Sequence, residues 1–420
     1  MGQNYNEYLR QKNRRKKTRF NAFAALTMIC LVAVIVLLNA SCSSSDKNSP
    51  PEVSAESGAV STQDLETSET ATSGQELSGS VPESSAAESG EVSGESSDVS
   101  GENSEVSDEA SDKPMEKPVY SNDHEYTENY SRFSSATHAE LDACLTTAYV
   151  ALYDMTADEI IYSKDLNKKI YPASTTKLLT AITASSIIKD PKTVITVGNE
   201  IEMCNWESSK AYIEEGMKLT FEMLMDALLL PSGNDAAYTM AVNAAKIYKN
   251  DQSLTNEEAV EIFMGLVNDC AKQIGASHTH YVTPDGWHDD DHYTSAYDLA
   301  VIGDYAKTVP IVRNSCAKPY VEWELLSGGF ISWTNSNKLI LENSGFYSKY
   351  NDGLKTGFTD EAGTSVVASA TMEGHTFIAV AMNGYTLYTK YQDCNTLFRK
   401  AFELYDLEFT SESDDMEYAY

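Results

Sequence analysis

The chain from Asp352 to Met382 reads DGLKTGFTDEAGTSVVASATMEGHTFIAVAM. It contains three runs of apolar and β-branched residues, separated by residues typical of turns, which is the pattern of short consecutive strands. Glu373-Gly374 predicts a tight turn between the last two runs. We therefore expect three successive strands, at residues 353–358, 364–371 and 375–382.

Segments on either side of this stretch add helices and one more hairpin. Two runs, 149–153 and 159–162, flank a polar turn and predict that hairpin. Helical spacing, caps and stops predict further helices: from Leu178 to Asp190-Pro191, from the N-cap Thr220 to Pro231, from Asp235 to Tyr248, and one carrying Cys394, Phe398, Ala401 and Tyr405. Because helices and strands are partly segregated along the chain, the pattern indicates an α+β fold.

The sequence Pro172-Ala-Ser174-Thr-Thr-Lys177 opens the first of these helices. Residues at i and i+3 share a helical face, so Ser174 and Lys177 should lie together. A serine hydroxyl is a poor nucleophile until a base takes its proton, and a lysine can be that base if burial or a second cation favours its neutral form. The helix N-terminus also supplies backbone N–H groups for an anionic intermediate. Alone, this spacing is common by chance.

A second candidate motif, Ser232-Gly-Asn234, follows Leu228-Leu-Leu-Pro231 and precedes a predicted helix. Ser and Asn are favoured helix caps, so the tripeptide by itself indicates only the start of a helix.

The third motif, Lys355-Thr356-Gly357, belongs to the first of the three predicted strands. A Lys at a strand edge followed by Thr offers a cation and a hydroxyl to a substrate carboxylate. The glycine lets a substrate backbone come close. By itself, this tripeptide would equally fit a solvated strand end.

Together, in this order, the three motifs resemble the signature set of penicillin-binding proteins and serine β-lactamases. The closer resemblance is to the low-molecular-weight D-alanyl-D-alanine carboxypeptidases, and it covers roughly residues 148–405. Four stretches carry it: Tyr171-Pro-Ala-Ser-Thr-Thr-Lys-Leu-Leu-Thr-Ala181, Leu228-Leu-Leu-Pro-Ser-Gly-Asn-Asp-Ala-Ala237, His292-Tyr-Thr-Ser-Ala-Tyr-Asp-Leu-Ala300 and Asn335-Ser-Asn-Lys338. The resemblance implies a DD-peptidase-like fold, with an antiparallel sheet flanked by helices plus a helical subdomain.

The resemblance also implies catalytic roles at matching positions. Ser174 resembles the acylated nucleophile, and Lys177 resembles the base that activates it. Ser232 would relay a proton to the leaving amine. Asn234 would orient Lys177 and bind a substrate amide.

Substrate-binding roles follow from the resemblance in the same way. Lys355 and Thr356 would hold the terminal carboxylate of the departing D-alanine, beside Gly357. The backbone N–H groups of Ser174 and Phe358 would form the oxyanion hole.

The implied activity is removal of the terminal D-alanine from peptidoglycan peptides ending in D-Ala-D-Ala, without a cofactor and with β-lactams as covalent inhibitors. Endopeptidase action on cross-links stays open, because it also cleaves after D-alanine. A β-lactamase is less favoured, since no Glu-x-x-x-Asn lies between Asn234 and Lys355. A non-catalytic module that binds cell wall or senses β-lactams is the alternative from another class.

Histidines and cysteines could suggest other chemistry. Four histidines near residues 289–291 could be metal ligands, but their spacing is a poor metal signature and we expect no metal site: His278, His280, His288 and His292. Five widely spaced cysteines contain no Cys-x-x-Cys and indicate buried free thiols, with one disulfide left open: Cys144, Cys204, Cys270, Cys316 and Cys394.

Charge divides the chain into three parts. The formal net charge of −32 combines +6 for residues 1–41, −15 for residues 42–117 and −23 for the remainder. This balance argues against a nucleic-acid partner, which requires a basic surface. It also argues against a folded body that adheres to anionic lipid.

The N-terminal part predicts membrane targeting. A basic stretch, 1–19, precedes residues 20–41, which contain no charge and are long enough to span a bilayer. Three outcomes stay open: an uncleaved anchor, a cleaved signal peptide, or lipidation at Cys42, since Asn39-Ala-Ser-Cys42 resembles a bacterial lipobox. We expect the following part of the chain at the extracytoplasmic face of a bacterial cell membrane.

The remaining boundaries follow from composition. Residues 43–119 contain no aromatic side chain and are rich in Ser and Glu, which predicts a disordered linker over 42–122. We expect the peptidase domain at 123–408 and an acidic tail at 409–420.

Overall fold

The computed structural model describes residues 114–415. The expected membrane segment, Cys42 and nearly all of the expected linker lie outside these residues. Across 114–415, no helix is both long and apolar enough to cross a bilayer.

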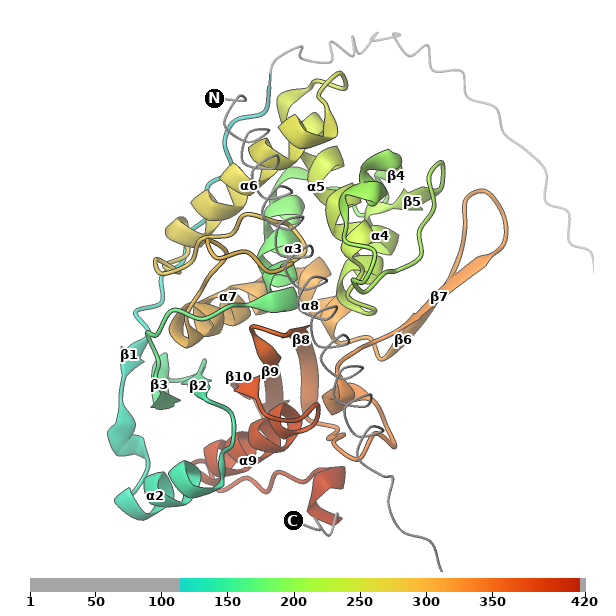
Figure 1. The fold of residues 1–420 in the computed structure, drawn as a ribbon. Coiled ribbons are helices and arrows are strands. Elements are labelled where there is room, and N and C mark those ends of the chain that lie inside the picture. The colour runs from blue at the N-terminus through green and yellow to red at the C-terminus, as the bar shows by residue number, and fades with distance from the viewer. Residues whose placement is uncertain (1–113, 416–420) are drawn as a thin grey trace, which may run out of the picture. The chain divides into compact units, whose positions relative to one another are not determined.

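A six-stranded sheet crosses the middle of the domain, in the order β1-β3-β2-β10-β9-β8 (Figure 1). The β1–β3 pair is parallel and the other pairs are antiparallel. Its strands are β1 (Thr127–Glu128), β2 (Tyr149–Asp154), β3 (Glu159–Lys164), β8 (Asn351–Thr359), β9 (Gly363–Met372) and β10 (His375–Gly384). The three consecutive C-terminal strands and the upstream hairpin are therefore confirmed, and β8 lies at a sheet edge.

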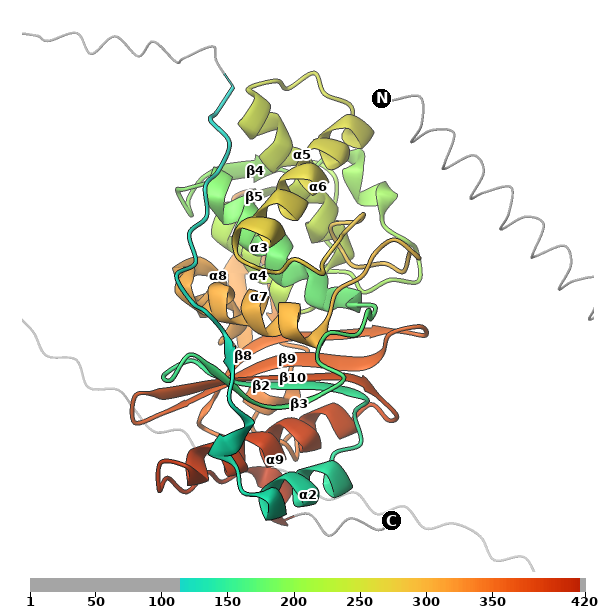
Figure 2. The same ribbon diagram turned by 90° about the vertical axis from the view of Figure 1, so that its left-hand side faces the viewer.

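Helices cover both faces of this sheet (Figure 2). On one face lie α2 (Ser135–Cys144) and α9 (Thr389–Glu403). The other face carries α3 (Thr176–Ile187), α4 (Phe221–Leu229), α5 (Asn234–Lys249), α6 (Asn256–Gln273), α7 (Ala296–Thr308) and α8 (Pro310–Cys316). This arrangement confirms the predicted α+β class, with the larger helical layer next to the first two motifs.

Side chains that alternate along the strands pack into two hydrophobic cores, one on each face of the sheet. On β10, Ile378 and Val380 belong to the core under the larger helical layer, whereas Phe377 and Ala379 belong to the core under α9. Successive side chains of a strand point to opposite faces, so a sheet buried on both sides needs apolar residues at every position.

The remaining strands form two two-stranded antiparallel sheets: β4 (Val194–Thr196) with β5 (Lys218–Thr220), and β6 (Tyr320–Glu324) with β7 (Phe330–Thr334). The predicted N-cap at Thr220 is confirmed, because its hydroxyl accepts from Met223 N at 3.2 Å. The last helix ends at Glu403, so Tyr405 lies just beyond it rather than within the helix.

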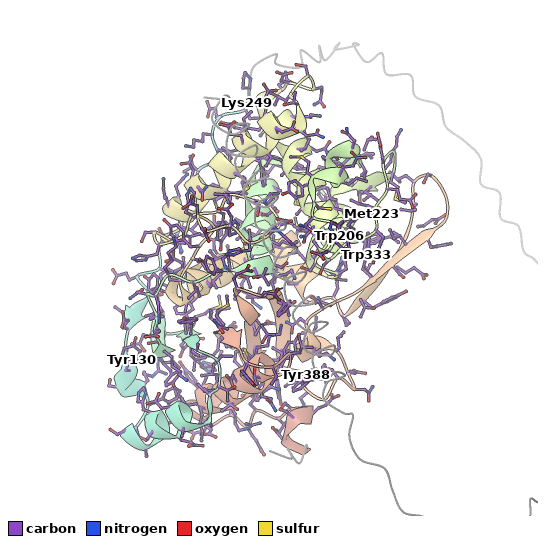
Figure 3. The ribbon with its side chains drawn as sticks, in the orientation of Figure 1. Tyr130, Trp206, Met223, Lys249, Trp333 and Tyr388 are labelled. Carbon is purple, nitrogen blue, oxygen red and sulfur yellow. The ribbon has the colours of Figure 1, made fainter. Side chains whose placement is uncertain are left out.

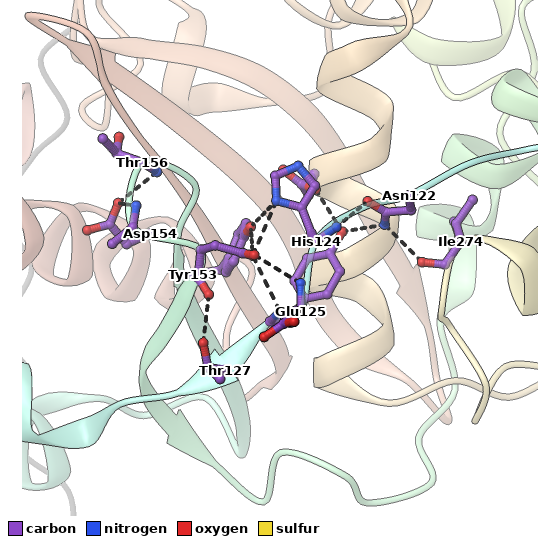
Figure 4. A network of polar contacts seen from close by, with 12 residues as sticks. Asn122, His124, Glu125, Thr127, Tyr153, Asp154, Thr156 and Ile274 are labelled. Carbon is purple, nitrogen blue, oxygen red and sulfur yellow. Dashed lines mark hydrogen bonds and ion pairs between the residues drawn. The ribbon is translucent and has the colours of Figure 1, made fainter.

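Polar contacts join the segment before β1 to the body of the domain (Figure 4). The Tyr153 hydroxyl donates to Asp158 Oδ1 at 2.7 Å and lies 3.2 Å from His124 Nδ1. Asn122 Nδ2 donates to the Ile274 carbonyl oxygen at 2.9 Å. At the other end, the side chain of Phe409 is buried. The packed body therefore includes residues close to both expected domain boundaries.

Candidate active site

The first motif forms a tight turn that leads into a helix. A 3₁₀ turn, η2 (Ala173–Thr175), precedes α3, so Ser174 stands at the helix entrance and Lys177 lies one turn further on. Ala173 has φ of 50°, a left-handed conformation that costs free energy for a residue with a Cβ. Lys177 is fully buried and Ser174 is half-buried.

Lys177 Nζ sits at the centre of the polar contacts of the site. It donates hydrogen bonds to Ser174 Oγ at 2.9 Å, to Asn234 Oδ1 at 2.7 Å and to the Asp285 carbonyl oxygen at 2.7 Å. The structure therefore brings the nucleophile and base candidates together with Asn234 of the second motif, 57 residues further along the chain.

Asp285 belongs to this cluster and was not among the residues selected from the sequence. Its carboxylate accepts from Asn234 Nδ2 at 2.7 Å and from Trp287 N at 3.0 Å, which fixes the amide so that its oxygen faces Lys177. The signal that could have found it is the turn sequence Pro284-Asp-Gly286. A Cβ on Gly286 would lie 1.9 Å from the Ala173 carbonyl oxygen, so the turn packs directly on the nucleophile segment.

Burial sets the protonation behaviour of Lys177. Its pKa is lowered to about 8, chiefly because a buried ammonium loses hydration, although Asp285 and Asp235 partly oppose the shift. The sequence pattern predicted that a second lysine would contribute to this shift. In the structure, burial is the largest cause.

Ser232 begins the second motif in a left-handed conformation, with φ of 65°. It lies in the turn between α4 and α5, where Asn234 is the first residue of α5. The Ser232 hydroxyl oxygen is buried and makes no hydrogen bond within the described part of the chain. It therefore retains its capacity to donate to, and accept from, a bound molecule.

The third motif lies on the edge strand β8. Lys355 is buried, and its Nζ donates to the Thr356 carbonyl oxygen at 3.0 Å. Burial, together with repulsion from Lys177, holds the pKa of Lys355 well below its usual value. The Thr356 hydroxyl lies 2.8 Å from Ser336 Oγ, a further contact that sequence analysis did not assign.

Gly357 brings β8 against the nucleophile turn. A Cβ at this position would lie 3.0 Å from the Pro172 carbonyl oxygen and 3.2 Å from the Ser174 backbone nitrogen. Only a residue without a side chain allows this approach comfortably. The next residue, Phe358, has an exposed side chain.

One of the four histidines, His292, makes hydrogen bonds beside the nucleophile turn. His292 is buried; its Nδ1 accepts from Val282 N at 3.1 Å, which leaves Nε2–H to donate to Thr176 Oγ1 at 2.8 Å. Thr176 Oγ1 in turn donates to the Ala173 carbonyl oxygen at 2.8 Å. Burial lowers the pKa of His292 to about 3. Within residues 114–415, no three metal-binding side chains converge. The five cysteines there are free thiols, but the expectation that they are buried is wrong for Cys144, which is exposed.

These groups can carry out nucleophilic catalysis. A neutral lysine amine has two N–H bonds and one lone pair. The Asn234 and Asp285 oxygens accept both N–H bonds, so the lone pair is left for the proton of the Ser174 hydroxyl. The geometry supports a serine activated by a lysine.

Comparison with known proteins places the domain among characterised relatives. A sequence model of the D-alanyl-D-alanine carboxypeptidase family matches residues 135–386. The D-alanyl-D-alanine carboxypeptidase DacA of Escherichia coli K12 is 29% identical over 61% of this chain and 60% of the relative. DacF of Bacillus subtilis 168, also a D-alanyl-D-alanine carboxypeptidase, is 25% identical over 61% and 62%. The chain spans about 60% of the length of these two relatives.

Solved structures share the fold. Penicillin binding protein 6B from Escherichia coli superposes with a TM-score of 0.53, at 26% identity over 61% of this chain and 77% of that chain. The Streptomyces K15 DD-transpeptidase superposes with a TM-score of 0.56 at 23% identity, covering 62% of this chain and 98% of that chain. The second likeness supports the fold alone.

Proposed function

Because this chain belongs to the D-alanyl-D-alanine carboxypeptidase family, we propose that it is a serine-type D-Ala-D-Ala carboxypeptidase acting on peptidoglycan stem peptides. The observation that carries the proposal is the placement of Lys177 Nζ, 2.9 Å from Ser174 Oγ with its other contacts directed at fixed acceptors.

Acylation follows from these contacts. Ser174 Oγ attacks the carbonyl carbon of the penultimate D-alanine while its proton passes to the lone pair of Lys177. The negative oxygen of the tetrahedral intermediate is held by the backbone N–H groups of Ser174 and Phe358, supported by the close approach of β8 to Ser174 N.

Departure of D-alanine requires a proton at its nitrogen. Lys177 returns the proton through the Ser232 hydroxyl, which is buried and without a partner inside 114–415. The C–N bond then breaks, and D-alanine leaves with its amine neutral. Water attacks the remaining ester, with Lys177 again taking the proton, and Ser174 is regenerated.

Recognition of the substrate end uses the third motif. The terminal carboxylate is held by Lys355 and the Thr356 hydroxyl, while Gly357 leaves room for the peptide backbone. A bound carboxylate offsets the burial cost of the Lys355 ammonium and favours its protonated form. Asn234 binds a substrate amide while orienting Lys177. No cofactor or metal takes part in these steps.

The surrounding chain supports action outside the cytoplasm. Residues 20–41 would target the protein to the membrane, with Cys42 as the acylation site if it is a lipoprotein. The linker over 42–122 would hold the peptidase domain, 123–408, at the extracytoplasmic face, and residues 409–420 form its acidic end. β-Lactams would acylate Ser174 in place of the peptide.

Digestion of purified muropeptides tests this function. The protein is expected to convert pentapeptide muropeptides to tetrapeptides with release of one D-alanine, and Ser174→Ala is expected to release none. Cleavage of cross-linked dimers without loss of terminal D-alanine would replace the carboxypeptidase assignment by an endopeptidase one. Hydrolysis of nitrocefin faster than the peptide would indicate a β-lactamase.

A further inference from the structure

Tyr212 has an unusual backbone conformation close to the second motif. Its φ is 57°, in the left-handed region that bulky residues rarely adopt. Within residues 114–415, most of the other non-glycine residues with positive φ are Asp or Asn, which tolerate it. Two of the exceptions, Ala173 and Ser232, belong to the proposed catalytic motifs. Such strain persists only where surrounding contacts enforce it, and it concentrates at functional sites.

Contacts on both sides of Tyr212 hold its backbone in place. The N–H groups of Ala211 and Ile213 donate to the two carboxylate oxygens of Asp235, at 2.8 Å and 3.3 Å. Both flanking side chains are buried. Trp333 of β7 adds a third fixed point, because its indole Nε1 donates to the Ala211 carbonyl oxygen at 2.9 Å. Figure 3 labels Trp333 on the inner end of this strand.

The loop at residues 205–213 also packs directly on the second motif. Asn234 N donates to the Ser209 carbonyl oxygen at 2.8 Å. A Cβ on Gly233 would lie 2.8 Å from Ala211 Cβ, so no side chain fits between the loop and the motif. Ala211, the residue before Tyr212, therefore packs directly on the turn that carries Ser232 and Asn234.

Despite this fixed backbone, the Tyr212 side chain is 79% exposed. The strain does not serve to bury the ring, since the buried side chains are those on either side of it. An exposed aromatic side chain on a fixed backbone offers a ligand an apolar face and a hydroxyl at a defined place beside the second motif.

We propose that Tyr212 is a specificity-determining residue that packs against the part of the stem peptide preceding D-Ala-D-Ala. The inference rests on the proposed function, in which Asn234 binds a substrate amide. A peptide that passes Asn234 continues next to the loop anchored to it. The tyrosine ring then covers aliphatic portions of the upstream residues, which a short acyl-D-Ala-D-Ala lacks.

Binding measured in a Ser174→Ala background tests the proposal without requiring turnover. The ligands are N-acetyl-D-Ala-D-Ala, a stem pentapeptide and the corresponding disaccharide pentapeptide. Adding Tyr212→Ala is expected to weaken both pentapeptide ligands by about 3- to 10-fold and to leave the short ligand unchanged. Tyr212→Phe is expected to retain most of the affinity. Phe330→Ala serves as the matched control, since its ring is 70% exposed near the end of the β6–β7 hairpin.

Three results would overturn the proposal: equal loss for all three ligands, loss for the disaccharide ligand alone, or no loss. A Tyr212→Gly variant separates contact from folding, because glycine adopts this φ without strain. It is expected to weaken pentapeptide binding while its thermal midpoint stays level or rises. A lower midpoint with unchanged binding would show that the ring is structural. Absence of D-alanine release by the unmodified protein would contradict the proposed function alone.

Discussion

The α3 side and the β8 side of the site each bury a lysine, but the two amines have different surroundings. Lys177 on α3 has three acceptors, including Asn234 and the Asp285 carbonyl. Within the described part of the chain, Lys355 on β8 has one hydrogen-bond acceptor, the carbonyl oxygen of its own neighbour Thr356. The first amine is positioned by the protein. The second is desolvated and has no salt bridge within residues 114–415, and under the proposed function a substrate carboxylate supplies the opposite charge.

The largest expected effect is on the rate of acylation, and it distinguishes Lys177 from Lys355. Lys177→Ala should slow acylation of Ser174 by benzylpenicillin by about 10³- to 10⁴-fold, because it removes the proposed base. Stopped-flow or gel-based labelling gives the rate, with Lys189→Ala as an exposed control near the end of the same helix. A variant rate within tenfold of the unmodified protein would remove Lys177 from the base role.

The second effect concerns recognition by Lys355. Its replacement by Ala should reduce kcat/KM for a peptide ending in a free carboxylate by about 10- to 100-fold, because one charge-assisted contact is lost. The same peptide with a C-terminal amide should be nearly unaffected. Equal losses for the acid and the amide would show that Lys355 acts on the fold or the nucleophile rather than on the carboxylate. Lys349→Ala provides the comparison variant.

A smaller effect lies in the pH dependence of acylation. The neutral form of Lys177 is the proposed base, and the pKa of Lys177 is lowered to about 8. The acylation rate should therefore rise up to about tenfold per pH unit below 8 and level off above it. The same shift makes the folded state bind fewer protons than the unfolded state between about pH 8 and 10.5, so its contribution to stability improves as pH rises. A flat rate profile from pH 6 to 9 would contradict the assignment.

The smallest effect concerns stability at low pH. His292 is buried and neutral with a pKa lowered to about 3, whereas an unfolded histidine titrates near 6.5. Between these two pKa values the unfolded state binds a proton that the folded state does not bind. The free energy of unfolding should therefore fall as pH drops from about 6.5 toward 3. The free energy of unfolding measured with urea should depend less steeply on pH in His292→Gln than in the unmodified protein. An unchanged slope would assign the acid sensitivity to other groups.

Local signals predicted much of the fold. The hairpin at 149–162 and the three C-terminal strands follow from alternation and turn residues, and Thr220 was recognised as a cap because a hydroxyl at that position satisfies a free backbone N–H. The β6–β7 hairpin was not predicted. Its position depends on tertiary contacts such as Trp333 to Ala211, which no local pattern encodes.

The site was predictable only where short motifs mark it. Ser174, Lys177 and Asn234 were selected from motifs far apart in the sequence, and the structure places them in contact. Asp285 was missed because it acts through a backbone carbonyl and an amide partner, and such contacts appear only in three dimensions. Tyr212 was missed for a similar reason, since its φ is imposed by Asp235 and by the packing of its buried neighbours.

Mass spectrometry of the protein after brief exposure to benzylpenicillin tests the central claim most directly. We expect one covalent adduct, retained on the proteolytic peptide that contains Ser174 and absent from Ser174→Ala. Competition by a D-Ala-D-Ala pentapeptide should slow adduct formation. An adduct on another residue, or one that persists in Ser174→Ala, would contradict the assignment of Ser174 as the nucleophile.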